Sequence, residues 1–119
     1  MTQLETLQKL VSDFSNERDW TQFHNLKDLA IGLSTESNEL LQYLRFKNEA
    51  ECLALLKANP EKIEDELADV FYYLLRIADL YGMDLEKGLR QKMIQNEAKY
   101  PADKVRGKNL KYDEYDQGD

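Results

Sequence analysis

The chain has 119 residues, of which 42% are hydrophobic, and this size suits one domain with one core. Its net charge of −7 argues against binding to a nucleic-acid duplex but leaves small phosphorylated ligands open. No apolar run approaches the roughly 20 residues of a membrane span, and residues 1–5 do not resemble a secretory leader, so we expect a cytoplasmic protein without membrane contact. One cysteine, Cys52, and one histidine, His24, exclude an internal disulfide and a zinc site rich in thiolates or imidazoles.

Apolar residues recur at helical spacing along nearly the whole chain, which contains only two prolines and five glycines. The pattern predicts an all-α protein. The first helix is expected from about residue 3 to residue 16. The second should begin between residues 21 and 26 and run to about residue 46.

The later helices are delimited by proline and by capping residues. A short helix is predicted from residue 48 until Asn59, because proline disfavours helical geometry in the residue before it. Pro60 then begins a helix that ends at Tyr81, and Asp84 is expected to cap a last helix that stops before Pro101. We therefore expect one all-α domain over residues 1–101, a bundle of four to five helices, and a polar, mobile tail over residues 102–119.

Two pairs of carboxylates lie within the apolar patterns of the second and fourth predicted helices. Glu36 with Glu39, and Glu66 with Asp69, are each three residues apart, so each pair shares a helix face. Carboxylates near a core lose solvation unless a cation, a proton or strong donors compensate them. The two pairs together suggest a site for a divalent metal ion.

If the second and fourth helices pack antiparallel, the four acids converge at one level of the bundle. Oxygen ligands suit Mg²⁺ or Mn²⁺, and protein-bound Mg²⁺ commonly also contacts substrate phosphates. Surface ion pairs with lysine or arginine are the alternative explanation for either pair alone. A di-iron site needs a Glu-x-x-His motif on two helices, and His24 lies in no such motif.

Four motifs occur in an order that resembles a known family. They are residues 18–29 (RDWTQFHNLKDL), 36–41 (ESNELL), 64–70 (EDELADV) and 92–101 (KMIQNEAKYP). Over roughly residues 18–112 the chain is similar to the MazG-like all-α nucleoside triphosphate pyrophosphohydrolases, in their dCTP pyrophosphatase-like branch. The resemblance implies the fold of the all-α NTP pyrophosphatases and Mg²⁺-dependent hydrolysis of a (deoxy)nucleoside triphosphate to the monophosphate and pyrophosphate.

The resemblance also implies roles for individual residues. Carried over by position, the catalytic and metal-binding residues are Glu36, Glu39, Glu66 and Asp69. In an alternative assignment, one of the glutamates does not bind the metal but orients or deprotonates the attacking water. The family further implies a homodimer or homotetramer whose subunits share active sites.

Substrate contacts are expected from two further segments. Lys92, Asn96 and Lys99 form one helical stripe that the family uses for the nucleotide, although the same stripe alone would suit a solvent-facing surface. Trp20 and His24 are expected to contact the base, although an aromatic cluster at the start of a helix can also serve packing alone. Lys27 occupies a position near the nucleotide in the family and is the last predicted contact.

Three hypotheses follow for the function. The first is a pyrophosphohydrolase that acts on dCTP or a modified nucleotide. The second is the phosphoribosyl-ATP pyrophosphohydrolase of histidine synthesis, against which the run from Trp20 to Lys27 argues. The third is a helical module that binds nucleotides without turnover.

Overall fold

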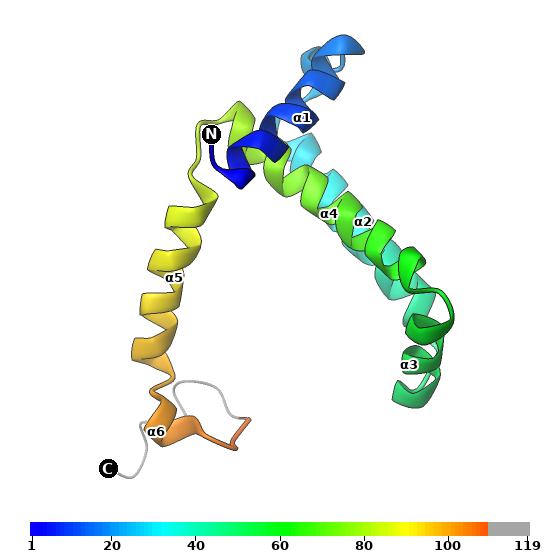
Figure 1. The fold of residues 1–119 in the computed structure, drawn as a ribbon, viewed down its shortest axis with the longest axis vertical. Helices are drawn as coiled ribbons and strands as arrows, with labels where there is room; N and C mark the ends of the chain where they lie inside the picture. The colour runs from blue at the N-terminus through cyan, green and yellow to red at the C-terminus, as the bar shows by residue number, and fades with distance from the viewer. Residues whose placement is uncertain (110–119) are drawn as a thin grey trace. The chain divides into compact units, whose positions relative to one another are not determined.

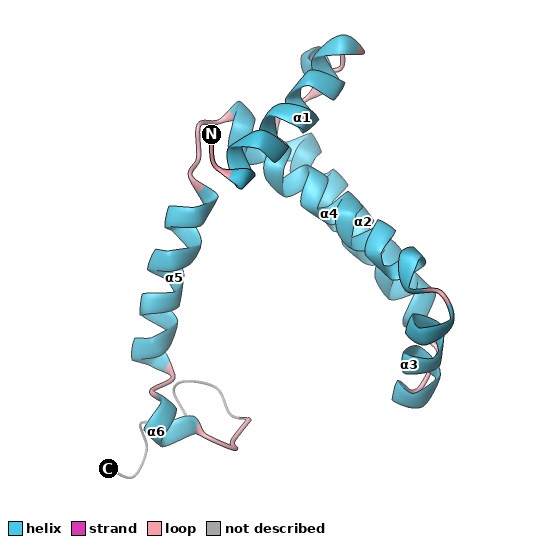
Figure 2. Ribbon diagram, in the orientation of Figure 1, coloured by secondary structure: helices cyan, strands magenta, loops and turns pink. Residues whose placement is uncertain are grey.

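The computed structural model describes residues 1–109, and within this range it contains helices and no strand (Figure 2). The elements are α1 (Gln3–Glu17), the 3₁₀ turn η1 (Thr21–Phe23), α2 (Leu26–Leu44), α3 (Glu49–Ala58), α4 (Pro60–Leu80), α5 (Leu85–Lys99) and α6 (Ala102–Val105). The predicted all-α class is confirmed. No helix between residues 1 and 109 combines the length and apolar character needed to cross a membrane.

Capping side chains set the helix starts that the sequence predicted. The Asn48 Oδ1 accepts a hydrogen bond of 2.8 Å from the Glu51 backbone N–H, and the Glu51 carboxylate accepts one in return from the Asn48 backbone. Pro60 occupies the first turn of α4, where its missing N–H has no intrahelical partner to lose. Asp84 caps α5 by accepting from the Lys87 N–H at 3.0 Å.

The second long helix begins at Leu26, at the late end of the predicted window, and ends slightly earlier than predicted. Asn25 has an extended backbone, and its side chain caps α2 by accepting from the Asp28 N–H at 2.9 Å. Residues Thr21–Phe23 therefore form the separate turn η1. Asp19 leads into this turn with a φ of 55°, a left-handed conformation that aspartate tolerates better than most residues.

The chain forms two compact units, and the first, Met1–Met83, contains α1 to α4. In this unit α4 packs against α2, α1 and α3. After α3 the chain returns along α2, so α2 and α4 are antiparallel (Figure 1). The fully buried apolar residues of the described chain are Leu29 on α2 and Leu75 and Ala78 on α4. This antiparallel pairing places the acid motif of α2 beside that of α4.

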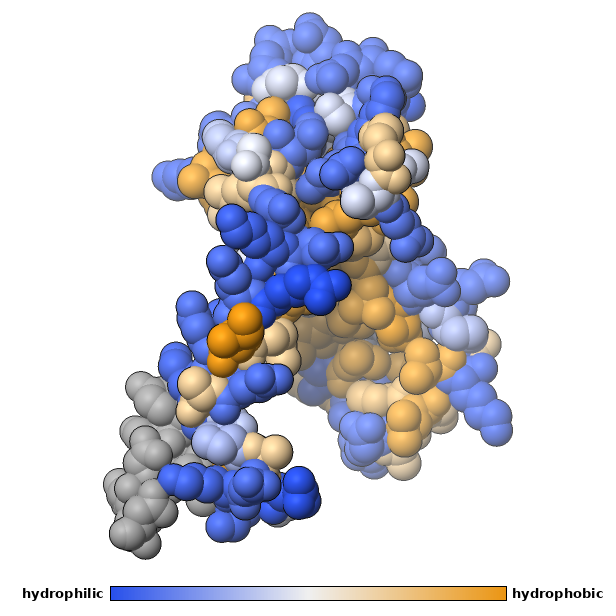
Figure 3. Space-filling view, turned by 60° about the vertical axis from the view of Figure 1, so that its left-hand side comes forward, coloured by the Kyte–Doolittle hydropathy of each residue, from blue (hydrophilic) through white to orange (hydrophobic). Residues whose placement is uncertain are grey.

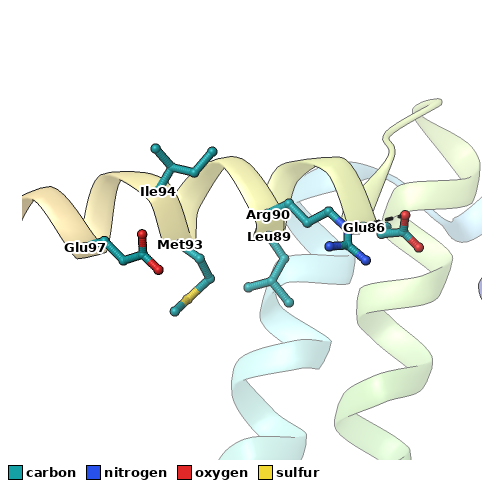
Figure 4. A pocket seen from close by; sticks show the side chains of 6 residues that line it. All are labelled: Glu86, Leu89, Arg90, Met93, Ile94 and Glu97. Atoms are coloured by element: carbon teal, nitrogen blue, oxygen red, sulfur yellow. Dashed lines mark ion pairs between the residues drawn. The ribbon is translucent and has the colours of Figure 1, made fainter. Parts of the chain in front are cut away.

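The second unit starts at Asp84 and contains α5 and α6. Leu89 and Met93 have the apolar spacing of an inward-facing helix side but are 64% and 48% exposed, because among the described residues of this unit only the four-residue α6 accompanies α5. Six α5 side chains line a hollow along this helix, where the Arg90 guanidinium lies 3.6 Å from the Glu86 carboxylate (Figure 4). The predicted tail includes α6, and its residues 110–119 lie outside the described residues.

Candidate metal centre and adjoining cavity

The structure brings the four predicted acids together. Glu36 and Glu39 come from α2, and Glu66 and Asp69 come from α4. Each offers a carboxylate oxygen, and these four atoms all lie within 4.8 Å of one another. Four oxygen donors at this separation form a cluster that could bind a metal ion.

Glu66 is the most deeply placed of the four, with 6% of its surface exposed. Its Oε1 accepts a hydrogen bond of 2.8 Å from the Lys62 ammonium group, one turn earlier on α4. Its Oε2 is buried and has no hydrogen-bond partner among the described residues. A buried carboxylate oxygen without a partner is unfavourable, and a cation bound between the acids would satisfy it.

The surroundings of the cluster shift the pKa of two of its members, Glu36 and Asp69. Burial, the Glu39 carboxylate and then the other two acids raise the pKa of Glu36 above its ordinary value. Burial and the charges of Glu66 and Glu39 raise the pKa of Asp69, and the ammonium of Lys62 only partly counteracts them. The ionised cluster is therefore under mutual repulsion that a divalent cation would relieve.

This repulsion predicts an unusual pH dependence for the metal-free protein. Because Glu36 and Asp69 have a higher pKa in the folded than in the unfolded chain, their contribution to stability is present at pH values below the ordinary carboxyl pKa. It is lost as the pH rises through their raised pKa. In the presence of a chelator, we expect the Tm to increase more on mild acidification for the natural protein than for an Asp69→Asn variant. Identical Tm profiles for the two proteins would contradict the repulsion.

A cavity of about 310 Å³ adjoins the acid cluster. It is lined by Phe14, Trp20, His24, Glu36, Asp69, Tyr72 and Tyr73. Trp20 meets Phe14 edge to face at a ring separation of 5.5 Å, and Tyr72 meets Tyr73 in the same way at 5.2 Å. The cavity therefore combines aromatic surfaces, suited to a planar ring, with carboxylates that could hold a cation.

A buried arginine of α4 holds a residue of the cavity wall through a hydrogen bond. The Arg76 side chain is 1% exposed and donates hydrogen bonds of 2.9 Å to the His24 Nδ1 and to the Thr21 hydroxyl. Arg76 was not among the site residues predicted from the sequence. A signal was present, because Arg76 is a charged residue within the apolar pattern of α4, seven residues after Asp69 and thus on the same helix face.

Comparisons with known proteins identify the family of the chain. The model of the MazG-like family matches residues 31–115. The chain belongs to the MazG-like family. Its curated relatives include dCTP pyrophosphatase 1 from Rattus norvegicus and from Homo sapiens, each 33% identical over 117 residues, which is 97% of this chain and 69% of the relative.

A solved structure supports the same relationship. A pyrophosphatase from Archaeoglobus fulgidus matches with a TM-score of 0.80 and 31% identity, covering 85% of this chain and 94% of that one. The predicted resemblance is thus confirmed. The predicted enzyme class, a nucleoside triphosphate pyrophosphohydrolase, is also confirmed, because the curated relatives are dCTP pyrophosphatases and the solved neighbour is a pyrophosphatase.

The other predicted contacts of this MazG-like chain are distributed over both units. Trp20 and His24 line the cavity, whereas Lys27 is exposed in the first turn of α2 and is not among the lining residues. Lys92, Asn96 and Lys99 lie on α5, in the second unit. Their contacts with a nucleotide stay a prediction.

Tyr73 is a lining residue that the sequence analysis missed, and its position depends on Gly32 of α2. A Cβ atom built on Gly32 would overlap the Tyr73 ring. The absent side chain therefore lets the tyrosine lie directly against α2, beside Glu36 and Asp69 in the cavity wall. Such a dependence between distant residues has no local signal in one sequence.

In this MazG-like protein, we expect Gly32→Ala to displace the Tyr73 ring. The overpacking should destabilise the fold by about 1–3 kcal/mol, and the disturbed cavity should reduce kcat/KM by roughly tenfold. Gly88→Ala is the matched control, because a Cβ atom there meets nothing within 4 Å and alanine favours the interior of α5. Thermal unfolding and turnover would be measured for both. Unchanged values for Gly32→Ala would contradict the close contact.

Proposed function

We propose that this protein is an Mg²⁺-dependent pyrophosphohydrolase that converts a deoxynucleoside triphosphate, dCTP or a modified nucleotide, to the monophosphate and pyrophosphate. The observation that carries the proposal is the four-carboxylate cluster beside an aromatic cavity. The substrate is taken from two relatives whose names specify dCTP. The expected compartment is the cytoplasm.

The acids fit Mg²⁺ by their chemistry. All four are hard oxygen donors, and the unpartnered buried oxygen of Glu66 supplies a position where a cation would be favourable. Mn²⁺ is expected to substitute because it accepts the same oxygen ligands. We assign Glu36, Glu39, Glu66 and Asp69 to hold the ion. When bound, Mg²⁺ supplies charge neutralisation on the phosphates and lowers the pKa of bound water.

Hydrolysis needs one water molecule and cleavage of the bond between the α-phosphorus and the oxygen that bridges to the β-phosphorus. The water oxygen bonds to the α-phosphorus, and pyrophosphate leaves with the bridging oxygen. One glutamate of the cluster is proposed to orient this water or to accept its proton. Trp20 and His24 are proposed to contact the base, and the remaining proposed contacts, to the phosphates and the sugar, are Lys27, Lys92, Asn96 and Lys99.

A panel of canonical and modified nucleoside triphosphates tests the proposal. With Mg²⁺ present, we expect pyrophosphate release to be fastest for dCTP or a modified nucleotide, and a Glu39→Gln variant to lose this activity. Phosphoribosyl-ATP belongs in the same panel. Binding without turnover of any member, or equal rates for the natural protein and Glu39→Gln, would refute the proposal.

We also propose that the protein assembles as a homodimer or homotetramer with shared active sites. Apolar side chains reach the surface in patches between hydrophilic ones (Figure 3). On α4 the exposed residues Leu67, Phe71 and Leu74 follow one another at helical spacing. A second copy would cover such a stripe. Light scattering is expected to give an even-numbered oligomer, and a monomer would contradict this assembly.

A further inference from the structure

Arg76 has the features of a residue that controls another side chain. A charged guanidinium is almost never fully buried unless it is paired, and that of Arg76 is buried with three partners. Its Nε donates to the His24 Nδ1, and a terminal nitrogen donates to the Thr21 hydroxyl, both at 2.9 Å. The other terminal nitrogen lies 3.3 Å from the Asp79 carboxylate, one turn further along α4.

The direction of the bond to His24 fixes the state of the imidazole. A guanidinium in a protein only donates hydrogen bonds, so the His24 Nδ1 has to accept through its lone pair. The ring is therefore neutral, and its single N–H hydrogen is on Nε2. In agreement, burial and the charge of Arg76 lower the pKa of His24.

His24 lines the cavity together with Trp20 and Tyr73. Because Nδ1 already accepts a hydrogen bond from Arg76, a ligand would bind to the ring through its Nε2–H group. We infer that Arg76 is a positioning residue that holds His24 in the Nε2–H tautomer, so that the cavity presents a hydrogen-bond donor to an acceptor atom on the edge of the nucleotide base. The role in substrate recognition rests on the proposed function, whereas the tautomer does not.

Cytosine suits such a donor, because its N3 and O2 atoms both accept hydrogen bonds. The opposite tautomer of His24 would direct a lone pair at these atoms and would repel them. The hydrogen bond between Arg76 and His24 would therefore act on recognition of the base and would leave the four acids proposed to hold the metal ion unchanged.

The tautomer can be measured directly because His24 is the single histidine of the chain. With ¹⁵N-labelled histidine, the nucleotide-free protein at neutral pH is expected to show an unprotonated Nδ1 and a protonated Nε2. A protonated Nδ1, or an imidazolium ring, would overturn the inference in the natural protein, before any variant is made. This result does not depend on turnover, so it is separate from a failure of the proposed function.

Variants then test whether the tautomer matters for the substrate. Arg76→Met removes the donor and is expected to give mixed tautomers and to raise the KM for dCTP by about tenfold, the factor expected for one hydrogen bond of about 1.4 kcal/mol, with a smaller change in kcat. Arg76→Gln can still donate a hydrogen bond from its amide, and it should partly restore the Nε2–H tautomer and the KM of the natural protein. Thr21→Val removes a different partner of Arg76 and should leave the tautomer and KM unchanged.

Two outcomes of this series would overturn the inference. The first is a KM for Arg76→Met equal to that of the natural protein. The second is a KM that rises equally for Arg76→Met, Arg76→Gln and Thr21→Val while the His24 spectrum stays constant, since that pattern would mean that Arg76 only stabilises the fold. If Arg76→Met does not fold, the comparison of Arg76→Gln with Thr21→Val decides in the same way.

Discussion

Replacing Asp69 by asparagine is expected to reduce kcat/KM by about 100-fold or more and, at the same time, to raise the Tm of the metal-free protein. The activity falls because a proposed metal ligand loses its charge. Even mutation of residues that only hydrogen-bond to a metal ligand typically lowers metal affinity or activity by about 10- to 100-fold. The stability rises because the substitution removes one of four carboxylates whose oxygens lie within 4.8 Å of one another. The raised pKa of Asp69 also indicates that its ionised carboxylate destabilises the folded state, so its removal should raise the Tm.

Glu64→Gln is the matched control for this experiment. It removes one negative charge from the same helix, outside the cluster. We expect its turnover to equal that of the natural protein and its Tm to change little. Steady-state kinetics with Mg²⁺ and thermal unfolding with a chelator would be compared for the three proteins. Loss of activity in both variants, or in neither, would contradict the assignment of Asp69.

Metal removal is expected to have the second large effect. A chelator should abolish turnover, and Mg²⁺ should restore it. At a Mg²⁺ concentration of roughly 100 times the dissociation constant, binding stabilises the folded state by about 2.7 kcal/mol. For a protein of this size, that corresponds to an increase in Tm on the order of 10 °C.

The Asp69→Asn variant distinguishes binding at the acid cluster from unspecific effects of the ion. We expect it to lose most of the Mg²⁺-induced Tm increase, whereas Glu64→Gln keeps it. An equal concentration of Na⁺ controls for ionic screening of the surface charge. A Tm increase of the same size in Asp69→Asn would place the bound ion elsewhere.

Local features of the sequence were sufficient for the helices and for the acid cluster. Asn48, Pro60 and Asp84 act on their own helix ends, so their effects can be read from short segments. The acid pairs were predictable because a spacing of three residues fixes a common helix face. Their convergence needed one further assumption, the antiparallel pairing of α2 and α4, and the structure has this pairing.

The remaining features depend on contacts between distant segments. The bond between Arg76 and His24 joins residues 52 positions apart, and the space for Tyr73 depends on Gly32 of another helix. Hydrophobic spacing also overestimated burial. Leu67 and Leu89 have the spacing of core residues and are exposed, because spacing shows which face is apolar and not what covers it.

The most direct test of the metal assignment is the position of Mn²⁺ in crystals grown with Mn²⁺ and α,β-imido-dCTP, an analogue whose α–β bond is not hydrolysed. Anomalous scattering locates the ion independently of the surrounding density. We expect the signal between the carboxylates of Glu36, Glu39, Glu66 and Asp69, in contact with the analogue's phosphates. A signal at another site with these four side chains unliganded, or a bound analogue without an ion at the cluster, would contradict the account.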